Sequence, residues 1–200
     1  MSRLPVRIAA AAAGLALVAT AASATAASAT AASAATPASG SAVIHESNAF
    51  FQQAAQAGIV AVPLPTATAG YDAATGLSAS FPVTDGSGSL RDFYGNIKLG
   101  GGLLFVDVRT GSAASFHQLS FSIDNWAVTG VADGTGTTVT LFDPAGNNSV
   151  TNSGTTQNLT ADSLVLDAAG AQYLDGKLRT TFFTAGQSVG SFAVTFTPAS

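Results

Sequence analysis

The chain of 200 residues contains no cysteine, and only 9% of its residues are charged. The lack of cysteine excludes disulfide bonds, thiolate catalysis and cysteine-ligated zinc or iron–sulfur sites. Histidine is scarce as well, with two copies, and Glu46 is the sole glutamate. Because two histidines without cysteine make a poor zinc ligand set, the sequence predicts no metal site.

Basic residues are also few. Lys and Arg number 7 against 11 Asp and Glu, which gives a net charge of −4. Proteins that bind nucleic acid usually present a basic surface, so a nucleic-acid partner is not expected. Neutral polar residues must cover most of the surface, a composition that suits an extracellular β protein better than a cytosolic enzyme.

The N-terminus has the order of a secretory signal peptide. Arg3 and Arg7 precede an apolar run over 8–18, and small residues follow, as in the three regions of such a peptide. The run is too short to span a bilayer, which takes about 20 apolar residues. We therefore expect a secreted protein without a transmembrane segment, either released or loosely associated with the cell envelope.

A repeated unit follows the apolar run. Thr-Ala-Ala-Ser-Ala occurs three times and offers cleavage after Ala24, Ala29 or Ala34, and the first site is favoured. The next residues lack the large apolar side chains that would offset the entropy cost of ordering. The predicted organisation is a signal peptide over 1–24, a disordered Ala/Ser/Thr-rich linker over 25–41 and one folded domain over 42–200.

The folded part is predicted to be mainly β. Short β-branched or aromatic runs recur between Gly, Asp and Asn clusters, which is typical of an antiparallel sandwich or barrel. Alternation over 116–123 places His117, Leu119 and Phe121 on one face, and a similar alternation covers 189–197. The predicted strands span 41–45, 59–63, 77–83, 95–99, 103–109, 116–123, 127–132, 137–142, 162–166, 178–183 and 189–197.

Two segments interrupt the β pattern and predict short helices. Over 47–58, Ser47 is a helix cap, the middle favours helix and Gly58 ends it. The segment 167–176 repeats this order, with Asp167 as the cap and Gly176 as the stop. In the first helix Phe50 and Phe51 line up with alanines, so we expect one or both to dock in the core.

Several short motifs carry a family resemblance. They are Phe-Pro-Val-Thr at 81–84, Gly-Asn-Ile at 95–97, Gly-Gly-Gly-Leu at 100–103, Leu-Val-Leu-Asp-Ala-Ala-Gly-Ala at 164–171 and Phe-Thr-Ala-Gly at 183–186, together with the runs 119–123 and 139–142. In this order they resemble secreted actinobacterial proteins of the haem-transport-associated HtaA type. The resemblance covers most of the chain after Val43.

The resemblance implies an Ig-like antiparallel β-sandwich with one or two short helices at its edge. It also implies display outside the cell and, in some members, a haem iron held by a Tyr with a nearby His. This chain has Phe50 and Phe51 in the helix that would supply the Tyr, and Lys98 and Leu99 in the strand that would supply the His. The haem ligands are thus not inherited residue by residue.

The strongest enzyme motif is Gly-Gln-Ser-Val-Gly at 186–190, which matches the nucleophile elbow of serine hydrolases. That elbow requires a helix after the serine and a later histidine. A predicted strand follows Ser188 instead, and both histidines, His45 and His117, precede it. The sequence therefore predicts a turn here, no catalytic residue and a protein that is not an enzyme.

The leading hypothesis is a secreted, non-enzymatic binding module without a resident cofactor, whose partner is a small apolar or haem-like ligand or an envelope component. Candidate ligand contacts are Phe50, Phe51, Tyr94, His117 and Trp126, because phenolate and imidazole ligate haem iron and Trp stacks on flat ligands. Two alternatives stay open. One is a haem-binding domain with an altered ligand set, and the other is a structural surface protein whose strands self-associate.

Overall fold

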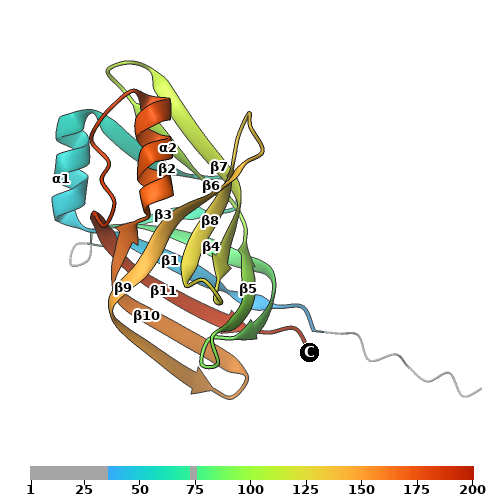
Figure 1. The fold of residues 1–200 in the computed structure, drawn as a ribbon. Coiled ribbons are helices and arrows are strands. Elements are labelled where there is room, and N and C mark those ends of the chain that lie inside the picture. Colours follow the sequence, from blue (N-terminus) through green and yellow to red (C-terminus); the bar gives the residue numbers. More distant parts are fainter. Residues whose placement is uncertain (1–35, 73–75) are drawn as a thin grey trace, which may run out of the picture. The chain divides into compact units, whose positions relative to one another are not determined.

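The computed structural model describes residues 36–72 and 76–200. The predicted signal peptide and residues 25–35 of the predicted linker lie outside the described residues, whereas β1 begins at Ser39. The described part contains eleven strands and two helices (Figure 1). They are β1 Ser39–Glu46, α1 Asn48–Ala57, β2 Ile59–Leu64, β3 Thr68–Asp72, β4 Gly76–Ser89, β5 Tyr94–Leu99, β6 Gly102–Asp107, β7 Ser112–Ser122, β8 Ala127–Ala132, β9 Thr138–Ser153, β10 Thr156–Leu166, α2 Ala168–Leu178 and β11 Ser188–Thr197.

Eight of the strands form a closed antiparallel barrel. They follow one another in the order β7, β5, β4, β1, β11, β10, β9, β8, and β8 pairs with β7 again. Three strands lie outside this ring. β6 pairs with β7, and within residues 36–72 and 76–200 β2 pairs only with β6 and β3 only with β4. The prediction of a mainly β fold with two short helices is confirmed, but the prediction of a sandwich of two sheets is not.

Irregular pairing explains the closure. Register shifts occur where β10 meets β9, where β10 meets β11 and where β7 meets β8. A β-bulge bends a strand and increases its twist, and such bends allow a long sheet to curl until its first and last strands meet. Single-strand alternation cannot reveal this, since it is the same in a sandwich and a barrel.

Both helices begin as predicted. The Ser47 side chain accepts a hydrogen bond of 3.1 Å from the backbone of Phe50, and Gly58 ends α1 with a φ of 81°. The carboxylate of Asp167 accepts a 2.7 Å bond from the backbone of Ala169 at the start of α2. Neither helix has the length and hydropathy that a membrane span requires.

The predicted strand over 178–183 is wrong. α2 continues past Gly176 to Leu178, and Arg179 ends it with a φ of 57°. Leu174 and Leu178, four residues apart on one helix face, are both fully buried. Their burial outweighs the modest cost of a glycine inside a helix, and the chain beyond runs as a loop that places Phe183 in the core.

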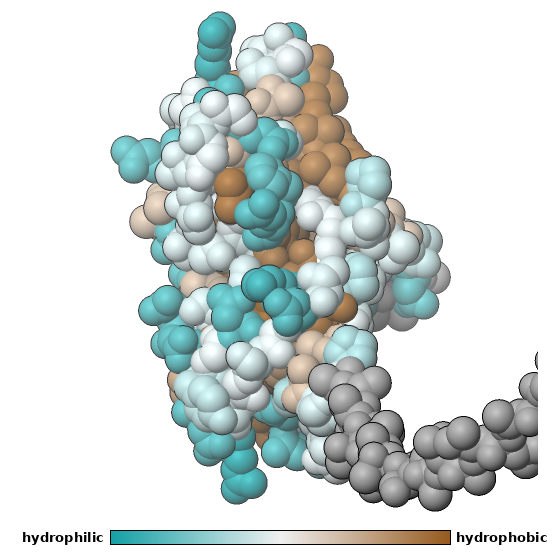
Figure 2. All heavy atoms as spheres, turned by 90° about the vertical axis from the view of Figure 1, so that its right-hand side faces the viewer, coloured by the Kyte–Doolittle hydropathy of each residue, from teal (hydrophilic) through white to brown (hydrophobic). Residues whose placement is uncertain are grey.

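The core fills the barrel with aromatic and aliphatic side chains. Phe81, Phe116, Phe121, Phe192 and Phe196 are each at most 2% exposed. Outside, one face is mostly hydrophilic or neutral, with a continuous hydrophobic area near its top (Figure 2). The predicted neutral polar surface is thus visible on this face, and hydrophobic side chains interrupt it.

Strand β7 corrects the predicted placement of His117. Phe116 and Leu119 are both buried although they are three residues apart, because Gln118 has a φ of 49° and the β7–β8 register shifts between His117 and Ser120. A bulged residue reverses which side chains face the core. His117 therefore lies half-buried on the outer side and does not share the face of Leu119 and Phe121.

Candidate ligand pocket

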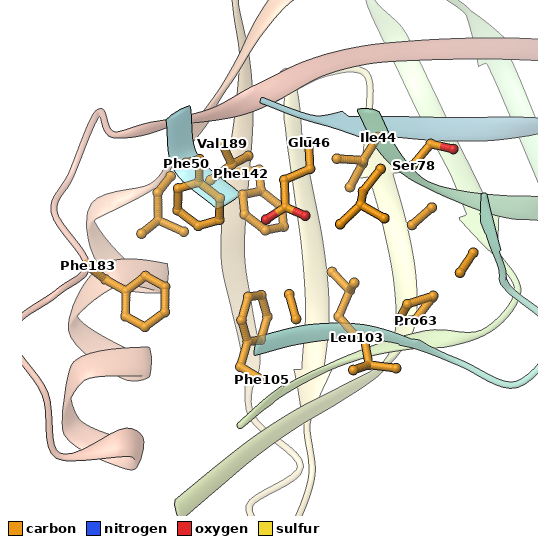
Figure 3. Close-up of a pocket in the computed structure, with 16 residues that line it drawn as sticks. Ile44, Glu46, Phe50, Pro63, Ser78, Leu103, Phe105, Phe142, Phe183 and Val189 are labelled. Atoms are coloured by element: carbon orange, nitrogen blue, oxygen red, sulfur yellow. The ribbon is translucent and has the colours of Figure 1, made fainter. Parts of the chain in front are cut away.

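A pocket opens where the sheet has edges. Strand β2 belongs to the β6 side of the sheet and β3 belongs to the β4 side, yet a short turn joins them, with the backbone of Ala67 bonded to Leu64 at 3.1 Å. No strand pairing links β2 to β3 among the described residues. The pocket lies between the paired strands β2–β6 and the hairpin β3–β4, beside α1 and the ends of β1 and β11. Figure 3 shows the side chains that line it.

The pocket is predominantly apolar. Its cavity volume is about 120 Å³, and fourteen of its sixteen lining residues are apolar. The apolar residues are Ile44, Phe50, Ala61, Val62, Pro63, Ala69, Leu77, Ala79, Leu103, Phe105, Phe142, Leu166, Phe183 and Val189. The two polar ones are Glu46 and Ser78. Such a lining suits a small ligand that is mostly hydrophobic.

Glu46 is the one charged side chain in the lining. It is the last residue of β1, and its carboxyl group points into the pocket toward the Phe50 and Phe142 rings (Figure 3). Burial raises the pKa of this carboxyl above its ordinary value. Opposite Glu46 on β11, Gly190 has no side chain, and a Cβ there would lie 1.8 Å from the carbonyl oxygen of His45. Glycine thus permits the close approach of the two strands that carry this wall.

The two predicted contact residues on α1, Phe50 and Phe51, differ in their burial. Phe50 is 5% exposed, lines the pocket and packs against Phe182 with ring centroids 5.8 Å apart. Phe51 is 47% exposed and points away from the core. The expected docking of the helix is confirmed through Phe50, and Phe51 is neither a core residue nor a pocket residue.

Neither Tyr94 nor Trp126 lines the pocket. Tyr94 is 57% exposed at the start of β5 and follows the exposed Phe93. Trp126 packs against Phe93 and Phe121 with centroid distances of 5.2 and 5.5 Å. Trp126 thus packs where the β4–β5 and β7–β8 turns meet, away from the cavity.

His117 lies in a third location, away from both the pocket and Trp126. Its Nδ1 lies 2.5 Å from Oδ1 of Asp133, and Asp133 also accepts a hydrogen bond from Ser115. The bond from Ser115 and the neighbouring His117 together hold the pKa of Asp133 below its ordinary value. The five predicted contact residues are thus distributed over separate sites, and Phe50 is the one that lines the pocket.

Ser188 lies in a shallow polar groove on the outer side of β1 and β11. The groove is lined by His45, Glu46, Ser47, Asp162, Ser188, Gly190 and Ser191. The Ser188 hydroxyl pairs with that of Ser163 at 2.9 Å. A nucleophilic serine needs a base within about 2.6–3.2 Å, and within the described part of the chain Ser163 is the hydrogen-bond partner of Ser188.

The fold is of the HtaA type. The chain is similar in structure to the C-terminal domain of HtaA from Corynebacterium glutamicum, with a TM-score of 0.52 and 17% identity over 81% of this chain and 99% of that one. It is also similar to the haem-binding protein HtaB from the same organism, with a TM-score of 0.45 and 15% identity over 82% and 94% of the two chains. The resemblance seen in the sequence is confirmed at the level of the fold. No protein-family model and no curated protein matches the chain.

The pocket does not fit a haem held by a protein ligand. Haem iron is held by His, Cys, Met or Tyr, and none of these residue types occurs in the lining. The volume of about 120 Å³ is below the range of roughly 300–1,000 Å³ for drug-sized ligands. Tyr71 pairs across from Leu77 in the β3–β4 hairpin, so it faces the pocket side, but it is 75% exposed and lies at the rim.

The residues that sequence reasoning missed are those that meet only through the fold. Leu103 and Phe105 on β6, Phe142 on β9 and Phe183 in the last loop are ordinary core residues in a linear reading. Glu46 did leave a signal, because the lone glutamate directly follows the predicted strand over 41–45 and precedes a capped helix. That signal marks Glu46 as unusual without indicating what it faces.

Proposed function

We propose that this chain is an extracellular, non-enzymatic binding domain that holds a small, largely apolar molecule in the pocket between α1, β2–β6 and β3–β4. The observation that carries the proposal is the apolar lining, which opens beside an edge strand rather than being closed within the barrel. The secretory leader predicted from the sequence supports an extracellular location. Sequencing the N-terminus of exported protein tests that part, since cleavage predicts a start between Thr25 and Ala35.

Binding is tested by NMR titration of the domain with benzyl alcohol, a neutral probe with a benzene-sized body. Ala61 is on β2, opposite Phe105 of the paired strand β6, and it lines the pocket. Ala61→Phe should therefore fill the cavity and abolish binding. Val60 is the preceding residue and does not line the pocket. Val60→Phe therefore adds the same ring to the same strand as a matched control, and it should leave binding unchanged. Equal binding by both variants, or no binding by the wild type, would contradict the proposal.

Haem is the second candidate ligand, favoured by the HtaA-type fold. The lining holds no iron ligand, so the ligand would be Tyr71, which faces the pocket side from the rim. Titration with haemin should then shift and sharpen the Soret band relative to free haemin, a change that Tyr71→Phe abolishes and Tyr94→Phe, outside the pocket, preserves. A Soret band identical to that of free haemin in the presence of the wild type would remove haem from consideration and leave the first candidate standing.

A further inference from the structure

Glu46 is an unpartnered carboxyl in an apolar wall. Among the described residues it has no hydrogen-bond or ion-pair partner, and the residues around its carboxyl group include the Phe50 and Phe142 rings (Figure 3). Glu46 is partly buried, and a carboxylate that loses part of its hydration costs free energy unless it is paired or hydrogen-bonded. A ligand that pairs with this carboxyl would offset that cost.

The chain itself supplies no cation to this site. None of its described Lys and Arg residues lines the pocket. Lys98 pairs with Asp85 at 2.7 Å, and Arg109 donates to the backbone of Gln56 in the last turn of α1. On its outer side Glu46 shares the polar groove with His45 and Asp162. The inner side of the carboxyl is therefore open to a partner that comes from outside.

We propose that Glu46 is the anchor for an amine, so that the ligand of this pocket is a metal-free molecule with an apolar body and a protonated amino group. This inference rests on the proposed function and names the ligand class. An ammonium group donates charge-assisted hydrogen bonds to a carboxylate, which are about twice as strong as neutral ones. It also neutralises the single charge of the lining, while the apolar side chains of the pocket contact the apolar body of the ligand.

The cavity size sets the size of the apolar body. A cavity of about 150 Å³ lined by Leu, Ile and Phe side chains binds benzene, and the volume here is about 120 Å³. Benzylamine, benzyl alcohol and benzoate share one ring and differ in the polar group. They therefore separate the contribution of the amine from that of the apolar walls.

The experiment is an NMR titration of the domain with these three probes at neutral pH. We expect benzylamine to bind at least tenfold more tightly than benzyl alcohol, and benzoate to bind most weakly. In Glu46→Gln the preference for benzylamine should vanish while benzyl alcohol binds as before. Asp162→Asn removes one negative charge from the groove outside the pocket, and it should keep the preference.

Each other outcome has a defined meaning. If benzyl alcohol binds but benzylamine binds no better, or if Glu46→Gln keeps the preference for the amine, the amine anchor is wrong and the apolar pocket stands. If Asp162→Asn removes the preference as well, general attraction by the acidic domain explains it and the anchor is wrong. If neither neutral nor cationic probe reaches the pocket, the proposed function itself fails.

Discussion

The closed part of the barrel differs from its open side, where β2, β3 and α1 lie, in how completely the strands are paired and the interior is filled. In the closed part every strand is paired along both edges, and the interior is filled by rings such as Phe121 and Phe192, whose centroids lie 5.4 Å apart. On the open side, β2 and β3 each pair along one edge among the described residues. Val60 and Val62 stay more than 40% exposed there, and a cavity remains.

This difference separates stability from binding. Unpaired strand edges and exposed apolar side chains are features that proteins usually limit, because they invite association. Here they surround a pocket with one carboxyl, so the less completely packed side of the molecule is the side that can receive a ligand. The contrast predicts a graded response to mutation, which the following experiments test from the largest effect to the smallest.

The largest effect is expected inside the closed part. Phe192 is 2% exposed and contacts Phe121 in a T-shaped geometry. Phe192→Ala should lower the free energy of unfolding by about 3–5 kcal/mol, a large share of the roughly 5–15 kcal/mol of a typical domain. Denaturant unfolding of the purified domain measures this. A loss below about 1 kcal/mol would show that the interior is not packed as described.

The next effect compares neighbours on α1. Phe50→Ala should cost about 3 kcal/mol, at the lower end for a buried Phe, because the adjoining pocket lets the wall relax. Phe51→Ala should change stability by no more than about 0.5 kcal/mol, since Phe51 is exposed. Thermal melts of the two variants, made side by side, provide the measurement. Similar melting temperatures would mean that α1 does not dock through Phe50.

The comparison also shows what the sequence could and could not predict. Both helix starts and ten of the eleven predicted strands correspond to observed elements, because caps and alternation are local signals. Strand β3 was missed, since Thr68–Asp72 is exposed throughout and carries no apolar face. The closure of the barrel, and the side of the sheet on which His117 lies, depend on β-bulges such as that at Gln118, which alternation does not encode.

The site was less predictable than the fold for the same reason. Phe50 was found because a helix places it on a recognisable stripe. Tyr94, His117 and Trp126 were chosen for their chemistry, and the fold places them elsewhere. Leu103, Phe142 and Phe183 come from two strands and a loop that are far apart in sequence, and they meet around the pocket only in the folded chain.

A smaller effect concerns the open side and depends on pH. Burial raises the pKa of Glu46 above its value of 4.5 in an unfolded chain. Protonated Glu46 therefore favours the fold, and this contribution is present below about pH 4.5 and is lost as pH rises through the raised pKa. Glu46→Gln has no such loss, so its stability relative to the wild type should increase from pH 4 to about pH 7.

Urea unfolding at several pH values measures this difference. Asp143, whose pKa is raised by burial and by the neighbouring Asp167, is present in both proteins. Its contribution therefore cancels in the comparison. A difference that is constant with pH would show that the Glu46 carboxyl is as well solvated in the folded protein as in the unfolded chain.

The smallest effect is expected at Ser188, the first residue of β11, in the groove on the outer side of β1 and β11. Its exposed hydroxyl pairs with Ser163, so Ser188→Ala removes one exposed hydrogen bond and should change stability by no more than about 0.5 kcal/mol. It should also leave benzyl alcohol binding unchanged, because Ser188 does not line the pocket.

A fluorophosphonate probe tests the remaining alternative directly, since it labels a serine only when a base has activated the hydroxyl. His45 and Asp162 share the groove with Ser188, so labelling that is lost in both Ser188→Ala and His45→Ala would identify this groove as catalytic. No labelling of the wild type is the expected result, because the hydrogen bond of Ser188 is made to another serine and not to an imidazole.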